Sequence, residues 1–301
     1  SSDLTEGTVS PASLVFTPAD WNLAQTVTVT GVDDALADGP QTYTIDTAEA
    51  VSADPNYSGR DAVNVSLSNV DNDTLGVTVS ATSLTTTEAG GTATFSIVLN
   101  TAPTGTVVIS LAGLDATEGT LSTNTLTFNA SNWSDAAAHT VTVTGVDDSV
   151  DDDDQTYTLV TTASGADYDG FSVPDVVVTN VDDDTRGVTV SATSLSTTEA
   201  AGPGHTASFS IVLNSQPTGT VTITLSGVDA TEGALSATTL TYDSSNWSNV
   251  AAHTVTVTGV DDTIADGAQA YTVITTATGA DYAGFTVLDV SVTNLDDDAL
   301  G

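Results

Sequence analysis

The acidic residues of this chain return in a fixed order along the sequence. In the middle of the chain they are Glu88, Asp115, Asp147, Asp148, Asp152, Asp182, Asp183 and Asp184. The same order returns as Glu199, Asp229, Asp261, Asp262, Asp266, Asp296, Asp297 and Asp298. The N-terminal part keeps Asp3, Asp33, Asp34, Asp38, Asp71 and Asp73. Carboxylates at close range repel unless a cation lies between them, and oxygen-only ligation suits Ca²⁺, which binds about 6–8 oxygens. These residues are therefore predicted to bind Ca²⁺ in each copy.

Other chemistry is disfavoured at these positions. Zinc and thiol sites need Cys or a recurrent His, but the chain has no Cys, and His139 and His253 align with Gln25. Each His is expected to be a surface strand or turn residue. Paired carboxylates can act as general acid and base, but clustered acids without a basic, aromatic-lined cleft, duplicated in tandem, favour a scaffold. The chain is therefore predicted not to be an enzyme.

A solvated acidic surface, as in a halophile, is the alternative to a metal site. It predicts acids on the outer face of every strand, whereas those faces carry Thr and Ser. Five acids outside the recurrent set are assigned to this solvated class: Glu118, Glu232, Asp151, Asp153 and Asp154.

Charge and composition exclude several classes of partner. The 301 residues contain 40 Asp and Glu but only 2 Arg and no Lys, which gives a formal net charge of −38. Nucleic acid and anionic membrane surfaces need clustered basic residues, so neither is an expected partner. No run of 18 apolar residues occurs, so this segment is not expected to insert into a membrane.

The chain contains internal repeats of about 110 residues. Trp133 lies 112 residues after Trp21, and Trp247 lies 114 residues after Trp133. Ser1 aligns with Gly113, so residues 1–74 are predicted to be a partial domain that lacks its first strands. Residues 75–185 are predicted to be a complete domain. Residues 186–301 are predicted to be a second complete domain plus the start of a next repeat, because Leu300-Gly301 matches Leu75-Gly76.

The partial first copy has two interpretations. Either the chain is a window on a longer array, or another chain supplies the missing strands by strand addition.

Alternating Val and Thr, without a sustained 3.6-residue period, predicts an all-β fold. In the middle copy the expected strands are 76–81, 92–99, 105–112, 120–128, 139–146, 155–162 and 172–180. Seven strands favour tandem antiparallel immunoglobulin-like sandwiches, arranged head to tail. Recurrent aromatics are expected to pack in or beside the core: Phe95, Phe128, Trp133, Tyr157, Tyr168 and Phe171. If successive strands run up and down, the loops that carry the recurrent acids lie at one end of each domain.

Three motifs resemble those of the Calx-beta domain. They are Thr87-Glu88-Ala89-Gly90-Gly91, then Val146-Asp147-Asp148 with Asp152, then Asn180-Val181-Asp182-Asp183-Asp184. This family is known from sodium–calcium exchangers, integrin β4 and very large bacterial surface proteins. The resemblance implies a seven-stranded sandwich that binds Ca²⁺ at one end through an early Glu, a mid-chain Asp, an Asp pair with a following acid, and a terminal Asp triplet. Asp152 departs from the pattern, where the family often has Glu, and its shorter reach puts the affinity in doubt.

The sequence therefore favours a Ca²⁺-binding stalk or surface fibre of a secreted or cell-surface protein, of bacterial origin and with a role in adhesion. The expected partners are Ca²⁺ ions and neighbouring repeats or copies of the same chain. Two alternatives stay open: a filament subunit assembled by strand donation between chains, and a non-catalytic module of a secreted enzyme.

Overall fold

The computed structural model describes residues 1–299 of the chain. Apart from two three-residue 3₁₀ turns, the regular elements of these residues are β-strands, which confirms the predicted all-β class. None of the described helical segments has the length and apolar character needed to cross a membrane. The predicted start of another copy at Leu300-Gly301 lies outside the described residues.

The chain divides into two compact units, which do not coincide with the sequence repeats. The first unit contains Ser1–Thr85, Thr92–Thr144 and Thr156–Thr179. The second contains Thr86–Gly91, Gly145–Gln155 and Asn180–Gly301. The three domain boundaries expected from the repeats stay a prediction.

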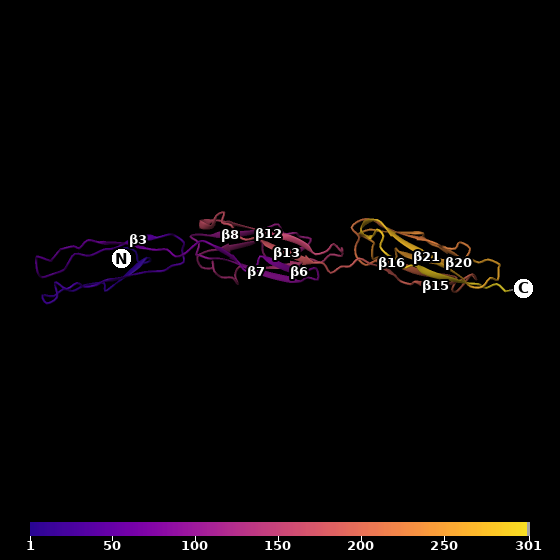
Figure 1. The fold of residues 1–301 in the computed structure, drawn as a ribbon, viewed down its shortest axis with the longest axis horizontal. Helices are drawn as coiled ribbons and strands as arrows, with labels where there is room; N and C mark the ends of the chain where they lie inside the picture. Colours follow the sequence, from indigo (N-terminus) through magenta and orange to yellow (C-terminus); the bar gives the residue numbers. More distant parts are fainter. Residues whose placement is uncertain (300–301) are drawn as a thin grey trace. The chain divides into compact units, whose positions relative to one another are not determined.

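Two sheets build the middle repeat (Figure 1). One has the order β10 (Thr125–Phe128), β8 (Val107–Ala112), β12 (Gln155–Ser164), β13 (Val176–Val181), β6 (Ser83–Thr87). The other has the order β5 (Val77–Val79), β7 (Thr92–Leu99), β11 (Thr140–Gly145), β9 (Gly119–Leu121). The core residues come from both sheets, so the two sheets form a sandwich.

The third repeat has the same order of strands. Its five-stranded sheet is β15 (Ser194–Thr198), β22 (Val290–Leu295), β21 (Gln269–Thr278), β17 (Val221–Ser226), β19 (Thr239–Tyr242). Its four-stranded sheet is β14 (Val188–Val190), β16 (Thr206–Leu213), β20 (Thr254–Gly259), β18 (Gly233–Leu235).

Alternation along the strands builds the cores. In β11, Val141 and Val143 are fully buried while the Thr residues between them face outward. The aromatics expected in the core are confirmed there: Phe95, Phe128, Tyr157 and Tyr168 are buried, and Trp133 and Phe171 are partly buried against the same cluster.

The surface position expected for two histidines is wrong. His139 and His253 are buried and stack on Phe128 and Tyr242 at ring-centroid distances of 3.9 and 4.0 Å. Both ring nitrogens of His139 contact backbone carbonyls, those of Asp135 at 2.9 Å and Thr127 at 3.0 Å. His139 therefore packs the core and holds a turn.

The middle repeat has nine strands rather than the expected seven, because one expected strand is divided between the two sheets and β6 forms between the first two expected strands. The Ser122 amide donates to Thr142 of one sheet, whereas two residues later the Asn124 carbonyl accepts from Leu111 of the other. The expected strand 120–128 is thereby divided into β9 and β10.

The expected purely antiparallel pairing is also wrong in one place. The first strand of each complete repeat is followed by a separate short strand, β6 or β15, in the opposite sheet. In the third repeat β15 runs parallel to β22, from Ser194 opposite Ser291 to Thr198 opposite Leu295. The chain leaves one sheet after β14, which is antiparallel to β16, and enters the other as β15, which is parallel to β22. The period of two along the sequence does not indicate such a change of sheet.

Residues 1–74 form two separate two-stranded sheets, β1 (Gly7–Ser10) with β2 (Thr28–Gly31), and β3 (Gln41–Ile45) with β4 (Val65–Asn69). Their apolar side chains are exposed where the equivalent ones in the middle repeat are buried. Phe16 is 52% exposed and Phe128 is 0% exposed, while Tyr57 is 55% exposed and Tyr168 is 0% exposed.

This contrast provides a matched pair of substitutions. Phe128→Ala should lower the free energy of unfolding of the middle repeat by about 3–5 kcal/mol, because it leaves a cavity in a packed core. Phe16→Ala at the equivalent exposed position should change stability by less than about 1 kcal/mol. Amide hydrogen exchange in the full chain measures both, in β7 and β11 for Phe128→Ala and in β1 and β2 for Phe16→Ala. Equal losses for the two variants would contradict the burial contrast.

Candidate metal centres

Parallel pairing brings Glu199 next to the terminal acid triplet of the third repeat. β15 ends with Thr198 opposite Leu295, the last residue of β22. The residues that follow, Glu199 and Asp296, therefore leave the sheet at the same edge. The Glu199 amide donates to the Leu295 carbonyl at 3.1 Å, which fixes the start of the glutamate side chain at this edge.

A buried asparagine connects this edge to the loop that carries the Asp pair. Asn294 accepts a hydrogen bond from the Thr197 hydroxyl at 2.9 Å and donates to the Val260 carbonyl at 3.0 Å. Val260 directly precedes Asp261 and Asp262. A Cβ at Gly259 would overlap the Asn294 carboxamide, so a glycine is needed at this close approach.

The sequence contains this asparagine in all three copies, before each acid triplet, but its structural role was not predicted. Asn180 donates to Val146 at 3.0 Å, and Asn69 donates to Val32 at 2.7 Å. Its recurrence among buried apolar strand residues was the available signal, because a buried amide needs partners.

Two overlapping groups of carboxylates lie beside Glu199. Oxygens of Glu199, Asp262 and Asp298 lie within 4.8 Å of one another, and so do oxygens of Glu199, Asp261 and Asp297. Glu199 is only 2% exposed, and its Oε2 atom is buried without a hydrogen-bond partner. In the middle repeat the corresponding group is Glu88, Asp148 and Asp184, within the same distance.

Hydrogen bonds within the loops hold these carboxylates in place. Asp262 accepts from the Ile264 amide at 2.7 Å, and Asp148 accepts from the Val150 amide at 2.7 Å. Each uses Oδ1 for this bond, which leaves the second oxygen available to a ligand.

Asp296 and Asp182 differ, because both oxygens of each accept hydrogen bonds within the loops, and they belong to none of the close groups among the described residues. The two oxygens of Asp296 accept from Asp298 at 2.8 Å and from Gly267 at 2.7 Å. The two oxygens of Asp182 accept from Asp184 at 2.8 Å and from Asp153 at 2.9 Å. Asp147 and Asp183 are likewise outside the close groups of residues 1–299.

The assignment of Glu232 and Glu118 to a solvated surface is wrong, since both are buried. Oxygens of Glu232, Asp262 and Asp266 lie within 4.8 Å of one another, so Asp262 belongs to groups on both sides. The cause is tertiary: the Val260 amide donates to the Glu232 carbonyl at 3.0 Å, which joins the Thr-Glu-Gly turn to the Asp pair.

The structure does not bring the predicted mid-chain Asp into these groups. Asp229 is exposed, and its Oδ1 accepts from the amide and hydroxyl of Thr231 at 3.0 and 2.7 Å. Asp115 makes the same bonds with Thr117, and these hydrogen bonds hold the pKa of both carboxyls below their ordinary value. Asp3 is bound in the same way by Thr5.

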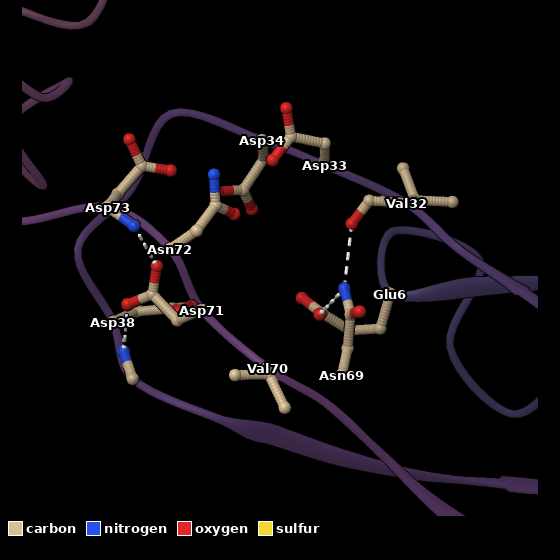
Figure 2. Close-up of a pocket in the computed structure, with 11 residues that line it drawn as sticks. Glu6, Val32, Asp33, Asp34, Asp38, Asn69, Val70, Asp71, Asn72 and Asp73 are labelled. Atoms are coloured by element: carbon tan, nitrogen blue, oxygen red, sulfur yellow. Dashed lines mark hydrogen bonds between the residues drawn. The ribbon is translucent and has the colours of Figure 1, made fainter.

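In the first copy the candidate ligands line one pocket (Figure 2). The expected residues at this pocket are Asp33, Asp34, Asp38, Asp71 and Asp73. Glu6, the equivalent of Glu232, lines it as well and was not predicted. Asn69 donates to Glu6 Oε2 at 3.3 Å, and Asn294 donates to Glu232 Oε2 at 3.4 Å, so the asparagine lies beside the glutamate in both copies.

Burial and mutual repulsion raise the pKa of carboxyls in all three copies. Burial is the largest cause for Glu199, and the Asp262 carboxylate adds to it. Burial also raises the pKa of Asp184, Asp298 and Asp73, with the neighbouring acids of each triplet as the second cause. Asp152 shows the same direction, again chiefly from burial, and its Oδ1 atom is buried without a hydrogen-bond partner. A bound cation would favour the charged form of every one of these groups.

The assignment of Asp151 to the solvated class is also wrong. Its Oδ2 atom lies 3.0 Å from Arg186 Nε in an ion pair. Hydrogen bonds from the backbone amide and side chain of Arg186 hold the pKa of Asp151 below its ordinary value. Asp154 accepts from the Asp182 amide at 3.3 Å, so it too takes part in the loop.

Comparison with known proteins gives no family: no family profile and no curated protein matches the chain. It is similar to the solved structure of CBD12 from CALX1.2, with 14% identity over 68% of this chain and 83% of that one, and a TM-score of 0.30. It is also similar to domains 4–9 of surface layer protein SbsC, with 15% identity, 91% and 43% coverage, and a TM-score of 0.24. At such low identity and TM-score, no functional conclusion follows, and membership of the Calx-beta family stays a hypothesis.

The shared position of Asp262 gives a test of the geometry. Asp262→Asn should lower the number of Ca²⁺ ions bound per chain, because it removes a charge from both groups around it. Asp229→Asn makes the same charge change in the same repeat at a residue outside the groups, and should leave the number unchanged. Equilibrium dialysis at fixed free Ca²⁺ measures both, and equal losses would contradict the distinction.

Proposed function

We propose that this chain is a Ca²⁺-binding structural segment of a secreted or cell-surface protein, of bacterial origin, whose repeats form a stalk or surface fibre in adhesion. Catalysis is no part of this proposal. The observation that carries it is Glu199, a buried carboxylate whose Oε2 atom has no hydrogen-bond partner and which lies among the oxygens of Asp262 and Asp298. Such a group is costly to bury unless a cation compensates its charge.

The donor set favours Ca²⁺ over other ions. The close groups contain carboxylates alone, without His, and the chain has no Cys, which disfavours zinc. Ca²⁺ accepts about 6–8 oxygens in flexible geometry, whereas Mg²⁺ requires a near-ideal octahedron and keeps several waters. Glu199, Asp262 and Asp298 would hold one ion, and Glu232 and Asp266 would hold a second that shares Asp262. At least two ions per complete repeat are therefore proposed.

A structural role follows from the repetition of the site. The same residue types occur at equivalent positions of both complete copies, at strand ends. The chain has only two Arg and no Lys among 301 residues, which leaves little basic surface for an anionic substrate. An extracellular location belongs to the proposal, since Ca²⁺ sites of extracellular modules typically have affinities of about 10⁻⁴–10⁻³ M.

Calcium should raise the stability of the full chain. Ligand linkage contributes about 2.7 kcal/mol per independent site at a hundredfold excess over the dissociation constant. A chain stripped with chelator should therefore melt several degrees lower than with Ca²⁺, and calorimetric titration should release or absorb heat with Ca²⁺ more strongly than with Mg²⁺. In the Glu199→Gln variant the chelator effect should shrink, and in Asp229→Asn it should persist. Equal melting temperatures with and without Ca²⁺ would favour the solvated acidic surface instead.

The second candidate function is a filament subunit completed by strands of another chain. The exposed Phe16 and Tyr57, at positions that are buried core in the middle repeat, favour it. Under this candidate the chain self-associates, and Phe16→Asp with Tyr57→Asp dissociates the assembly, whereas Val160→Asp on the outer face of β12 does not. Sedimentation over a range of concentrations measures this, and a monomer at all concentrations rules the candidate out.

A further inference from the structure

The tip of an acidic loop contacts the following repeat in the same way at two places in the chain. The Ala102 amide donates to the Ala35 carbonyl at 2.8 Å, and the Gln216 amide donates to the Ser149 carbonyl at 2.6 Å. Donor and acceptor are both displaced by 114 residues between the two bonds, and each bond lies within one compact unit. The two bonds are therefore copies of one junction between successive repeats.

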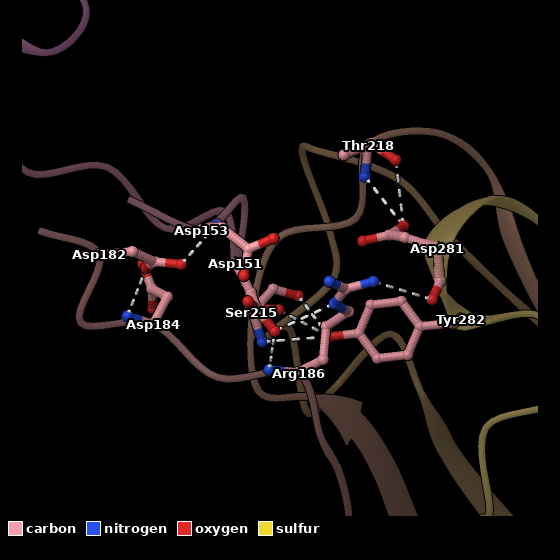
Figure 3. A network of polar contacts seen from close by, with 9 residues as sticks. All are labelled: Asp151, Asp153, Asp182, Asp184, Arg186, Ser215, Thr218, Asp281 and Tyr282. Atoms are coloured by element: carbon pink, nitrogen blue, oxygen red, sulfur yellow. Dashed lines mark hydrogen bonds and ion pairs between the residues drawn. The ribbon is translucent and has the colours of Figure 1, made fainter. Parts of the chain in front are cut away.

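The second junction has an additional ionic contact (Figure 3). The backbone amide and Nε of Arg186 both donate to Asp151 Oδ2, at 2.7 and 3.0 Å. Nη1 of the same residue donates to the Asp281 carbonyl at 3.5 Å. Arg186 is the first residue of the third repeat. It therefore connects the loop tip of the middle repeat, at Asp151, to a turn of the third repeat, at Asp281.

The turn whose Asp281 carbonyl accepts the hydrogen bond from Arg186 is itself held by hydrogen bonds. The Asp281 carboxylate accepts from the Thr218 amide and hydroxyl at 3.2 Å each. The next residue, Tyr282, is fully buried, and its hydroxyl donates to the Ser215 carbonyl at 3.0 Å. Arg186 therefore contacts a rigid part of the third repeat, which makes the contact able to hold the loop tip.

The sequence changes both members of this ion pair together. Asp151 is replaced by Ala37 in the first copy and by Ala265 in the third. Arg186 is replaced by Leu75 at the first junction and by Leu300 after the third copy. The sequence has only 2 Arg in 301 residues, and it combines an arginine with the one aspartate and a leucine with each alanine at these two positions. This correspondence indicates a matched pair of positions.

We infer that the loop tip is a docking surface for the following repeat, and that the residue pair at positions 151 and 186 decides which repeat fits. One junction carries an acid with an arginine, and the other carries an alanine with a leucine. The tip of the third copy, with Thr263, Ile264 and Ala265, is of the apolar kind. Ile264 is 61% exposed, whereas its equivalents Leu36 and Val150 are half-buried. The partner that fits this tip is a further copy of the repeat that begins with leucine.

The test uses the full chain and reads the junction through one amide. Exchange of the Gln216 amide reports opening of the second junction, and exchange of the equivalent Ala102 amide reports the first junction as an internal control. Asp151→Ala and Arg186→Leu should each speed the Gln216 exchange about two- to fivefold, as expected for a partly exposed ion pair, and leave Ala102 unchanged. High salt should act on the unsubstituted chain in the same direction, through screening.

The double variant, Asp151→Ala with Arg186→Leu, recreates the pair of the first junction and should bring the Gln216 exchange back toward the original rate. A double variant that exchanges as fast as the faster single variant, or single variants without effect on Gln216, would overturn the inference. Unchanged exchange in β20 and β21 confirms that each variant is folded. Repeating the series in chelator separates this result from the calcium proposal, since neither Asp151 nor Arg186 belongs to the proposed ligands.

Discussion

The repulsion between carboxylates gathered at one edge of the sheet is the constraint on which this structure depends. Glu199 and the triplet from Asp296 meet there because two strands end side by side in parallel. The ion pair between Arg186 and Asp151 lies elsewhere, and the close groups at this edge among residues 1–299 consist of carboxylates. Such an arrangement destabilises the fold locally, and a divalent cation would convert it into a cross-link between strand ends.

The protein holds this edge in place with neutral polar groups. Asn294 satisfies its buried amide by bonding Thr197 and Val260, so it joins three chain segments without adding charge. Glycine at position 259 permits the close approach. Further from the edge the fold relies on alternating Val, Leu and aromatic residues in each sandwich. The strands that carry the acidic groups are therefore packed through contacts that do not involve these carboxylates.

Several strands could be predicted from the sequence, because a period of two marks a half-buried strand, and β7, β11 and β12 lie within two residues of the expected ranges. The sheet changes could not, because the bond from Ser122 to Thr142 depends on a distant strand. For the same reason Glu232 was missed: contacts with the distant residues Val260 and Asn294 bring it to the site. Spacing placed Asp229 in the site, but local bonds from Thr231 engage its carboxylate instead.

The pair formed by Asp151 and Arg186 shows how a single arginine can make one junction specific in so acidic a chain. In the matched pair the Arg186 side chain is 35% exposed and the Asp151 side chain 18% exposed. Arg186 opposite alanine would leave the guanidinium with no acid to bond, and leucine opposite Asp151 would leave the carboxylate with the backbone amide but without its side-chain donor. Either mismatch loses hydrogen bonds to a charged group, which costs more than the matched contact gains. A matched pair thus discriminates more through the penalty for wrong neighbours than through its own strength, and specificity of this kind needs only two positions per junction. In a row of near-identical repeats, whose backbone contacts are the same at each junction, such a pair is what distinguishes one junction from the next.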